Sequence, residues 1–162
     1  MFSSDILIRA ETLLADARAK GLKIATAESC TGGLVAGLLT EIPGSSDVVE
    51  RGFVTYSNQA KEEMLGVPAA MLRQHGAVSE PVARAMAEGA IRNSTAQLSV
   101  AVTGVAGPGG GSDDKPVGLV HIAAARAGEA TLHRECRFGD IGRDAVRLAS
   151  VATALEMLQS LV

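Results

Sequence analysis

The sequence predicts an α/β protein, with a single three-layer α/β/α domain and a mixed sheet over residues 1–162. A chain of 162 residues suits one hydrophobic core. Segments with helical spacing of apolar residues alternate with short apolar strands in the early part of the chain, a pattern typical of strands joined by crossover helices. Two neighbouring strands then come late, near 117–126 and 130–138. The apolar fraction is 47% with only 2% aromatics, so the core is expected to pack through aliphatic side chains.

Five elements are expected in the first part of the chain. The first is a helix over about residues 4–20, whose apolar positions recur at helical spacing before a stop at Gly21. Those positions are Ile6, Ala10, Leu13, Leu14 and Ala17. The others are a strand over 22–27, a helix over Thr31–Ile42 ended by Pro43-Gly44, a strand over 48–57 that delivers Tyr56 to its end, and a short helix over Asn58–Leu65.

A connecting segment follows, and Ser79-Glu80-Pro81 then opens a helix. Its predicted buried face consists of Val82, Ala83, Met86, Ala87 and Ala90. The next strand alternates Leu98, Val100 and Val102, and a glycine loop separates it from the two late strands. A closing helix starts at about Asp140, with a predicted buried stripe of Ile141, Ala145, Leu148, Ala152 and Leu155.

Charge and cysteine content narrow the class of protein. A net charge of −3 and a pI near 5.6 provide no basic field for a polyanion, so direct nucleic-acid binding is not expected. Cys30 and Cys136 lie outside any Cys-x-x-Cys motif and no secretory signal precedes them, so both are interpreted as thiols. No apolar run reaches membrane-spanning length, and the expected localisation is cytoplasmic.

The junction from Lys23 to Leu34 contains the first candidate for chemistry, Ser29. An apolar strand runs into Ser29-Cys30-Thr31-Gly32-Gly33 where a helix should begin, so a hydroxyl and several backbone N–H groups would meet at a positive helix end. This arrangement suits a nucleophile with an oxyanion hole. The alternative is an ordinary N-cap formed by Ser29 or Thr31, and Cys30 is a rival nucleophile.

A serine nucleophile needs a base, and the sequence offers Lys61. None of His75, His121 and His133 carries a local triad signature. Lys61 falls in the first turn of the predicted helix after Tyr56, where the positive helix end would lower its pKa and favour a neutral amine. The alternative for Lys61 is an ordinary surface lysine.

The loop Gly104–Gly111 and two arginines are candidates for ligand binding. The loop follows a strand and could bring backbone N–H groups to a phosphate or ribose, with the Thr103 hydroxyl turned toward the same cleft; a plain flexible connection is the alternative. Arg143 and Arg147 lie four residues apart, on a face opposed to the predicted apolar stripe, and could clamp a phosphate. Asp140 and Asp144 could instead pair with them on a solvent face. No residues show metal-ligand spacing.

Taken together, the motifs resemble the CinA C-terminal domain family, whose stand-alone members include nicotinamide mononucleotide deamidases of the PncC type. The matching segments run over nearly the whole chain: Ala27–Gly33, Tyr56-Ser57-Asn58 with Lys61, Thr103–Pro108 with Gly110-Gly111, Lys115–Gly118, and Phe138-Gly139 with Arg143 and Arg147.

The resemblance implies hydrolysis of the carboxamide of nicotinamide mononucleotide to nicotinate mononucleotide and ammonia, without a metal or organic cofactor. It implies Ser29 as nucleophile, Lys61 as base, and Tyr56 as a proton relay or a support for Lys61. N–H groups near Thr31, Gly32 and Gly33 would stabilise the oxyanion. The remaining substrate-binding positions would be Thr103, Gly104, Gly107, Gly110 and Arg143, with Arg143 favoured over Arg147 for the phosphate.

Two other functions stay open at this stage. The cleft could belong to a non-catalytic, nucleotide-binding regulatory module linked to competence or DNA damage, or the chain could be DNA-associated, which the acidic pI disfavours. The expected partners are a small nucleotide substrate and a second copy of the chain in a homodimer, with no membrane.

Overall fold

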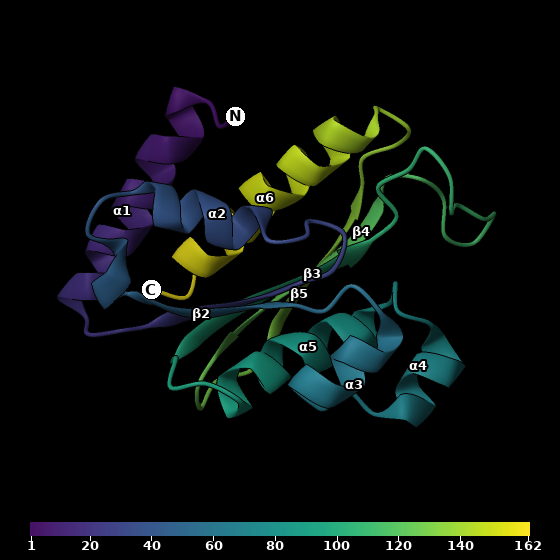
Figure 1. Cartoon of the computed structure of the whole chain (residues 1–162), viewed down its shortest axis with the longest axis horizontal. Coiled ribbons are helices and arrows are strands. Elements are labelled where there is room, and N and C mark those ends of the chain that lie inside the picture. Colours follow the sequence, from purple (N-terminus) through teal and green to yellow (C-terminus); the bar gives the residue numbers. More distant parts are fainter.

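The computed structural model describes all 162 residues as three layers, a five-stranded sheet between two groups of helices (Figure 1). The elements in chain order are α1 (Ser4–Ala19), β1 (Ile24–Glu28), α2 (Leu34–Glu41), β2 (Val49–Val54), α3 (Asn58–Leu65), α4 (Ala69–His75), α5 (Glu80–Arg92), β3 (Leu98–Gly104), β4 (Leu119–Arg126), β5 (Leu132–Arg137) and α6 (Arg143–Gln159), with a 3-10 turn at Ser45–Asp47. The predicted α/β/α fold class is confirmed.

The sheet is mixed, in the order β2-β1-β3-β4-β5. Strands β2, β1 and β3 run parallel, whereas β4 and β5 are antiparallel to their neighbours. The carboxyl ends of β1, β2 and β3 therefore meet at one edge, which in α/β sheets is the edge that binds ligands. Ser29, Thr55 and Gly104 all lie at this edge.

Each face of the sheet has its own apolar core. Helices α1, α2 and α6 cover one face, and α3, α4 and α5 cover the other (Figure 1). The predicted stripe of the first helix and the predicted face of α5 are buried in these two cores. The second core is rich in alanine, so α5 packs close to β3 and β4.

Local signals explain the helix that carries Lys61. The Ser57 hydroxyl accepts a hydrogen bond of 3.0 Å from the N–H of Ala60 and caps α3, and Gly66 ends the helix in a left-handed conformation. The predicted bounds of Asn58–Leu65 are therefore confirmed.

Several predicted elements need correction. Helix α4 occupies part of the expected connecting segment, and α2 begins at Leu34 rather than Thr31. The closing helix begins at Arg143, and of its predicted buried stripe only Leu155 is buried, whereas Ile141 and Leu148 are exposed. The buried positions are Val146, Ser150, Val151, Thr153, Ala154, Leu155, Met157 and Leu158. None of the helices combines the length and apolar character that crossing a membrane requires.

Candidate active site

Ser29 stands in a tight turn that joins β1 to α2. Its N–H donates to the carbonyl of Val102 over 2.9 Å, which continues the pairing of β1 with β3, and its carbonyl accepts from the N–H of Gly32 over 3.0 Å. Gly32 and Gly33 have φ of +58° and +101°, conformations that glycine adopts without a Cβ clash. The turn thus ends the strand and exposes the Ser29 side chain at the sheet edge. We call residues 29–33 the nucleophile turn.

The buried carboxylate of Glu28 caps α2. Its two oxygens accept hydrogen bonds from the N–H groups of Val35 and Ala36, at 2.9 and 3.0 Å. These donors of the first helical turn are therefore occupied, and the expectation that an open, positive helix end lies beside Ser29 is corrected. Nothing in the local sequence shows that the Glu28 side chain turns back onto the helix.

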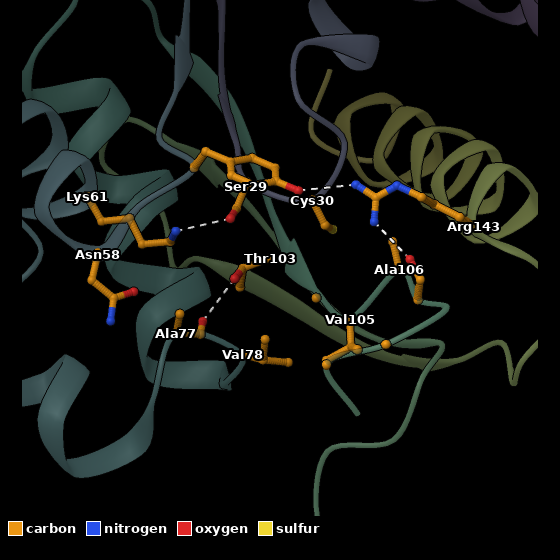
Figure 2. A pocket seen from close by; sticks show the side chains of 15 residues that line it. Ser29, Cys30, Asn58, Lys61, Ala77, Val78, Thr103, Val105, Ala106 and Arg143 are labelled. Atoms are coloured by element: carbon orange, nitrogen blue, oxygen red, sulfur yellow. Dashed lines mark hydrogen bonds between the residues drawn. The ribbon is translucent and has the colours of Figure 1, made fainter. Parts of the chain in front are cut away.

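Lys61 reaches Ser29 from α3 (Figure 2). Its Nζ lies 3.0 Å from Ser29 Oγ and donates to the carbonyl of Thr55 over 2.7 Å. The residue is only 1% exposed, so the surface-lysine alternative is wrong. Burial lowers the pKa of Lys61 from its ordinary 10.5 to about 8. Burial, rather than the helix end invoked from the sequence, is the dominant cause.

Cys30 is a poor rival for the role of nucleophile. It lines the same pocket, but burial raises the pKa of its thiol to about 11, so the thiolate is scarce at neutral pH. The three histidines lie outside the pocket, and His121 and His133 hydrogen-bond to each other over 2.9 Å on strands β4 and β5.

Tyr56 and Arg143 both line the pocket and contact each other. The Arg143 guanidinium donates to the Tyr56 hydroxyl over 3.1 Å and to the carbonyl of Gly107 over 2.9 Å (Figure 2). Tyr56 makes no hydrogen bond to Lys61, and the carbonyl of Thr55 supports the lysine instead. The Tyr56 hydroxyl therefore contacts Arg143 and does not hold Lys61 by a hydrogen bond, which corrects the expected support of Lys61 by Tyr56.

Arg147 points to a different place from Arg143. Its Nε and Nη2 each donate over 3.1 Å, to the carbonyls of Cys30 and Thr31 respectively. Neither arginine forms an ion pair with Asp140 or Asp144, so the alternative of pairing with these aspartates is wrong, although Arg143 itself is exposed. The two arginines do not converge as a clamp, because one faces the pocket and the other the nucleophile turn.

These groups surround a pocket of about 310 Å³, which is at the small end of ligand sites. Its 15 lining residues are Ser29, Cys30, Tyr56, Asn58, Lys61, Ala77, Val78, Thr103, Gly104, Val105, Ala106, Gly107, Gly109, Gly110 and Arg143. The predicted Thr103, Gly104, Gly107, Gly110 and Arg143 are thus brought together with Ser29 and Lys61.

The backbone at Thr31, Gly32 and Gly33 is close to Ser29, but these residues do not line the pocket. The N–H of Gly32 is committed to the Ser29 carbonyl, whereas no hydrogen bond uses the N–H of Thr31 or Gly33. The Thr103 hydroxyl donates to the carbonyl of Ala77 over 2.9 Å and so fixes the pocket wall.

Sequence reasoning missed Asn58, Ala77 and Val78 as lining residues. Asn58 lay within the quoted Tyr-Ser-Asn motif, whereas Ala77 and Val78 carry no chemical signal and reach the pocket through the chain path between α4 and α5. No group of three or more histidine, cysteine, aspartate or glutamate side chains is placed to hold a metal ion.

The fold and the site define a three-layer α/β/α protein with a serine–lysine pair at the carboxyl edge of its parallel strands. Residues 8–162 match the family model described as the CinA C-terminal domain, and the chain belongs to this family. The predicted resemblance is confirmed.

Relatives cover the chain almost completely. It is 51% identical over 159 residues, 98% of this chain and 95% of the other, to the nicotinamide-nucleotide amidohydrolase PncC of Escherichia coli strain K12. It is 52% identical over 150 residues, 92% of its length, to the CinA-like protein of Anaeromyxobacter sp. strain K, of which the match covers 36%.

Among solved structures, the competence/damage inducible protein CihA of Agrobacterium tumefaciens matches with a TM-score of 0.98 and 57% identity, over 99% of this chain and 98% of the other. A CinA superfamily protein of Escherichia coli matches with a TM-score of 0.92 and 35% identity, over 100% of this chain and 94% of the other.

Proposed function

We propose that this chain is an amidohydrolase that converts nicotinamide mononucleotide to nicotinate mononucleotide and ammonia. The observation that carries the proposal is the 3.0 Å contact between Ser29 Oγ and the buried amine of Lys61 inside a ligand-sized pocket. The 51% identity to a nicotinamide-nucleotide amidohydrolase supports the choice of substrate class.

Ser29 attacks the carboxamide carbon in the first step. A neutral Lys61 amine donates one N–H to Thr55 and keeps its lone pair for the Ser29 proton. As the oxygen–carbon bond forms, the proton passes to Lys61 and the amide oxygen becomes an oxyanion. The Lys61 ammonium then returns a proton to the departing nitrogen, so ammonia leaves and an ester on Ser29 remains.

Water cleaves the ester in the second step. Lys61 is neutral again after ammonia leaves and accepts a proton from the water as it attacks the ester carbon. Collapse of the second tetrahedral intermediate releases nicotinate mononucleotide, and Ser29 recovers its proton from Lys61. Both steps balance with the substrate, one water molecule and the side chains of Ser29 and Lys61, so the proposal requires no metal.

Arg143 and the glycine loop hold the substrate in this proposal. Arg143 is exposed and lies on the pocket wall with only a phenol and one carbonyl as partners, so its guanidinium has donors for a phosphate. Gly107 and Gly110 lie on the same wall and let the backbone approach the ribose phosphate closely. Tyr56 orients Arg143 at the pocket mouth.

The test is ammonia release from a panel of amide-bearing nucleotides, in the presence and absence of a metal chelator. We expect turnover of nicotinamide mononucleotide that the chelator leaves unchanged. Ser29→Ala and Lys61→Ala should each lower turnover by several orders of magnitude. The matched controls are Ser4→Ala and Lys23→Ala, since both residues are exposed and neither lines the pocket.

Two results would contradict the proposal. Near-normal ammonia release by Ser29→Ala would remove the serine from the mechanism. Tight binding of the nucleotide without product in the wild-type protein would instead support a non-catalytic binding module.

A further inference from the structure

We infer that Arg147 is a positioning residue that holds the nucleophile turn, and with it Ser29, from outside the pocket. The inference rests on the proposed function and deepens it. Arg147 does not line the pocket; with Leu34, Asp144 and Leu148 it lines a separate hollow between α2 and α6.

Both side-chain hydrogen bonds of Arg147 go to the nucleophile turn. Its guanidinium bridges two successive carbonyls, those of Cys30 and Thr31, at 3.1 Å each. The same guanidinium lies over Gly32, where a Cβ would be 3.5 Å from Nη2. Cys30 and Thr31 are buried. The carbonyl of Cys30 has no other hydrogen-bond partner, whereas the carbonyl of Thr31 also accepts from the N–H of Leu34 over 3.1 Å.

The two bonds also fix where the turn's N–H groups point. In a trans peptide the N–H of one residue points opposite to the carbonyl of the residue before it. Because the carbonyl of Cys30 faces Arg147, the N–H of Thr31 faces away from the guanidinium. No hydrogen bond in the structure uses that N–H, so it is a free donor on the side of the turn away from Arg147.

Arg143 provides the contrast on the same helix. It precedes Arg147 by about one helical turn and contacts Tyr56 and Gly107, both of which line the pocket. A phosphate in the pocket would meet Arg143, whereas Arg147 would act on the reaction only through the backbone beside Ser29. The two arginines therefore have separate tasks.

The expected kinetics follow from this separation. Arg147→Met loosens the turn without removing a substrate contact, so kcat should fall about 10- to 100-fold while KM changes little, as expected for a small misplacement of a reacting group. The kcat of Arg147→Lys should lie between those of Arg147→Met and the wild type, because an ammonium cannot bridge two carbonyls as a planar guanidinium does.

The test compares each variant on two substrates, nicotinamide mononucleotide and the same nucleoside without its phosphate. For Arg147→Met, the fold-loss in kcat/KM should be the same on both. For Arg143→Met, the loss should largely disappear when the phosphate is absent. Arg73→Met, an exposed arginine on α4, serves as the matched control. Circular dichroism and thermal melting check folding, and Arg147→Lys replaces the Met variant if the latter does not fold.

A second readout does not depend on the substrate. A fluorophosphonate forms a phosphorus–oxygen bond with Ser29 Oγ and releases fluoride, the serine proton passing to Lys61. The rate of this labelling, followed by intact mass, should fall in Arg147→Met and stay unchanged in Arg73→Met.

The outcomes separate the two proposals. If the loss at Arg147 vanishes with the phosphate-free substrate, or if labelling and turnover are both unchanged, the positioning role is refuted. If the wild type turns over no amide nucleotide while labelling still slows in Arg147→Met, the proposed function fails and the positioning role stands. If the wild type turns over the nucleotide but not the phosphate-free nucleoside, the labelling rate tests the positioning role: slower labelling of Arg147→Met supports it, and an unchanged rate refutes it.

Discussion

Replacing Lys61 by Met should stabilise the protein at neutral pH, by an amount that depends on pH in a defined way. Burial lowers the pKa of Lys61 from 10.5 to about 8, a difference of about 2.5. At about 1.4 kcal/mol per pKa unit, keeping the ammonium in the fold costs about 3 kcal/mol. The Met side chain removes this cost, but the carbonyl of Thr55 loses its partner, which offsets about 1 to 3 kcal/mol.

The pH dependence of stability separates the cost of the Lys61 charge from the loss of the hydrogen bond to Thr55, because only the charge changes with pH. Between pH 8 and 10.5 the unfolded chain still holds the Lys61 proton while the folded chain has lost it, so wild-type stability rises with pH in this window. Below about pH 8 both states are protonated and the full cost applies. The stability advantage of Lys61→Met over the wild type should therefore shrink by about 3 kcal/mol as the pH rises from 8 to 10.5.

Urea denaturation of both proteins at several pH values between 7 and 10.5 measures the difference directly, and Lys23→Met is the matched control at an exposed lysine. Other titrating groups cancel because they are common to the proteins compared. Parallel stability curves for the wild type and Lys61→Met would refute the lowered pKa and, with it, a neutral Lys61 as base.

Three further predictions concern activity and the turn. The value of kcat/KM should rise with pH, with an inflection near 8, because only the neutral Lys61 amine accepts the Ser29 proton; a flat profile from pH 6 to 10 would contradict this. Arg143→Met should raise KM for nicotinamide mononucleotide by about 10- to 100-fold, the loss of one or two charge-assisted hydrogen bonds, with a smaller effect on kcat. Glu28→Gln should lower the free energy of unfolding by about 1 to 3 kcal/mol, since one of the two capped N–H groups loses its acceptor and the other keeps only a neutral one. An unchanged urea midpoint would show that the cap contributes little.

Two helices that the sequence predicts well, α1 and α5, have only apolar residues or glycine at their buried positions. The stripe from Ile6 to Ala17 and the face of α5 are apolar, so periodicity alone locates them. Helix α4 has only seven residues and one buried side chain, Leu72, which is too short a pattern to show a period.

The sequence pattern predicts the wrong buried stripe for the closing helix, and the reason is physical. Its buried side includes Ser150 and Thr153, whose hydroxyls donate to the carbonyls of Val146 and Ala149, four residues earlier. Such back-bonding satisfies a hydroxyl inside a core, so a pattern based on hydropathy places these residues on the solvent side. The predicted stripe therefore lies on a different side of the helix from the observed one, and it does not predict that Arg147 faces the nucleophile turn.

The candidate site could be predicted in part because of the sheet topology. Ser29 follows β1 and Lys61 lies on the helix after β2, so parallel pairing of these strands brings both to one edge. The support given by the Thr55 carbonyl, the Glu28 cap and the Arg147 bridge depends on side-chain directions set by tertiary packing. Local sequence carries no signal for these three contacts.

The most direct test of the account is whether Ser29 becomes acylated during turnover. Rapid acid quenching of the protein with excess nicotinamide mononucleotide, followed by peptide mass analysis, should find the nicotinate mononucleotide acyl group as an ester on the peptide that contains Ser29. The same experiment on Ser29→Ala should give neither the ester nor ammonia at the wild-type rate. Ammonia release at that rate from Ser29→Ala, with no ester on either protein, would contradict the serine–lysine mechanism.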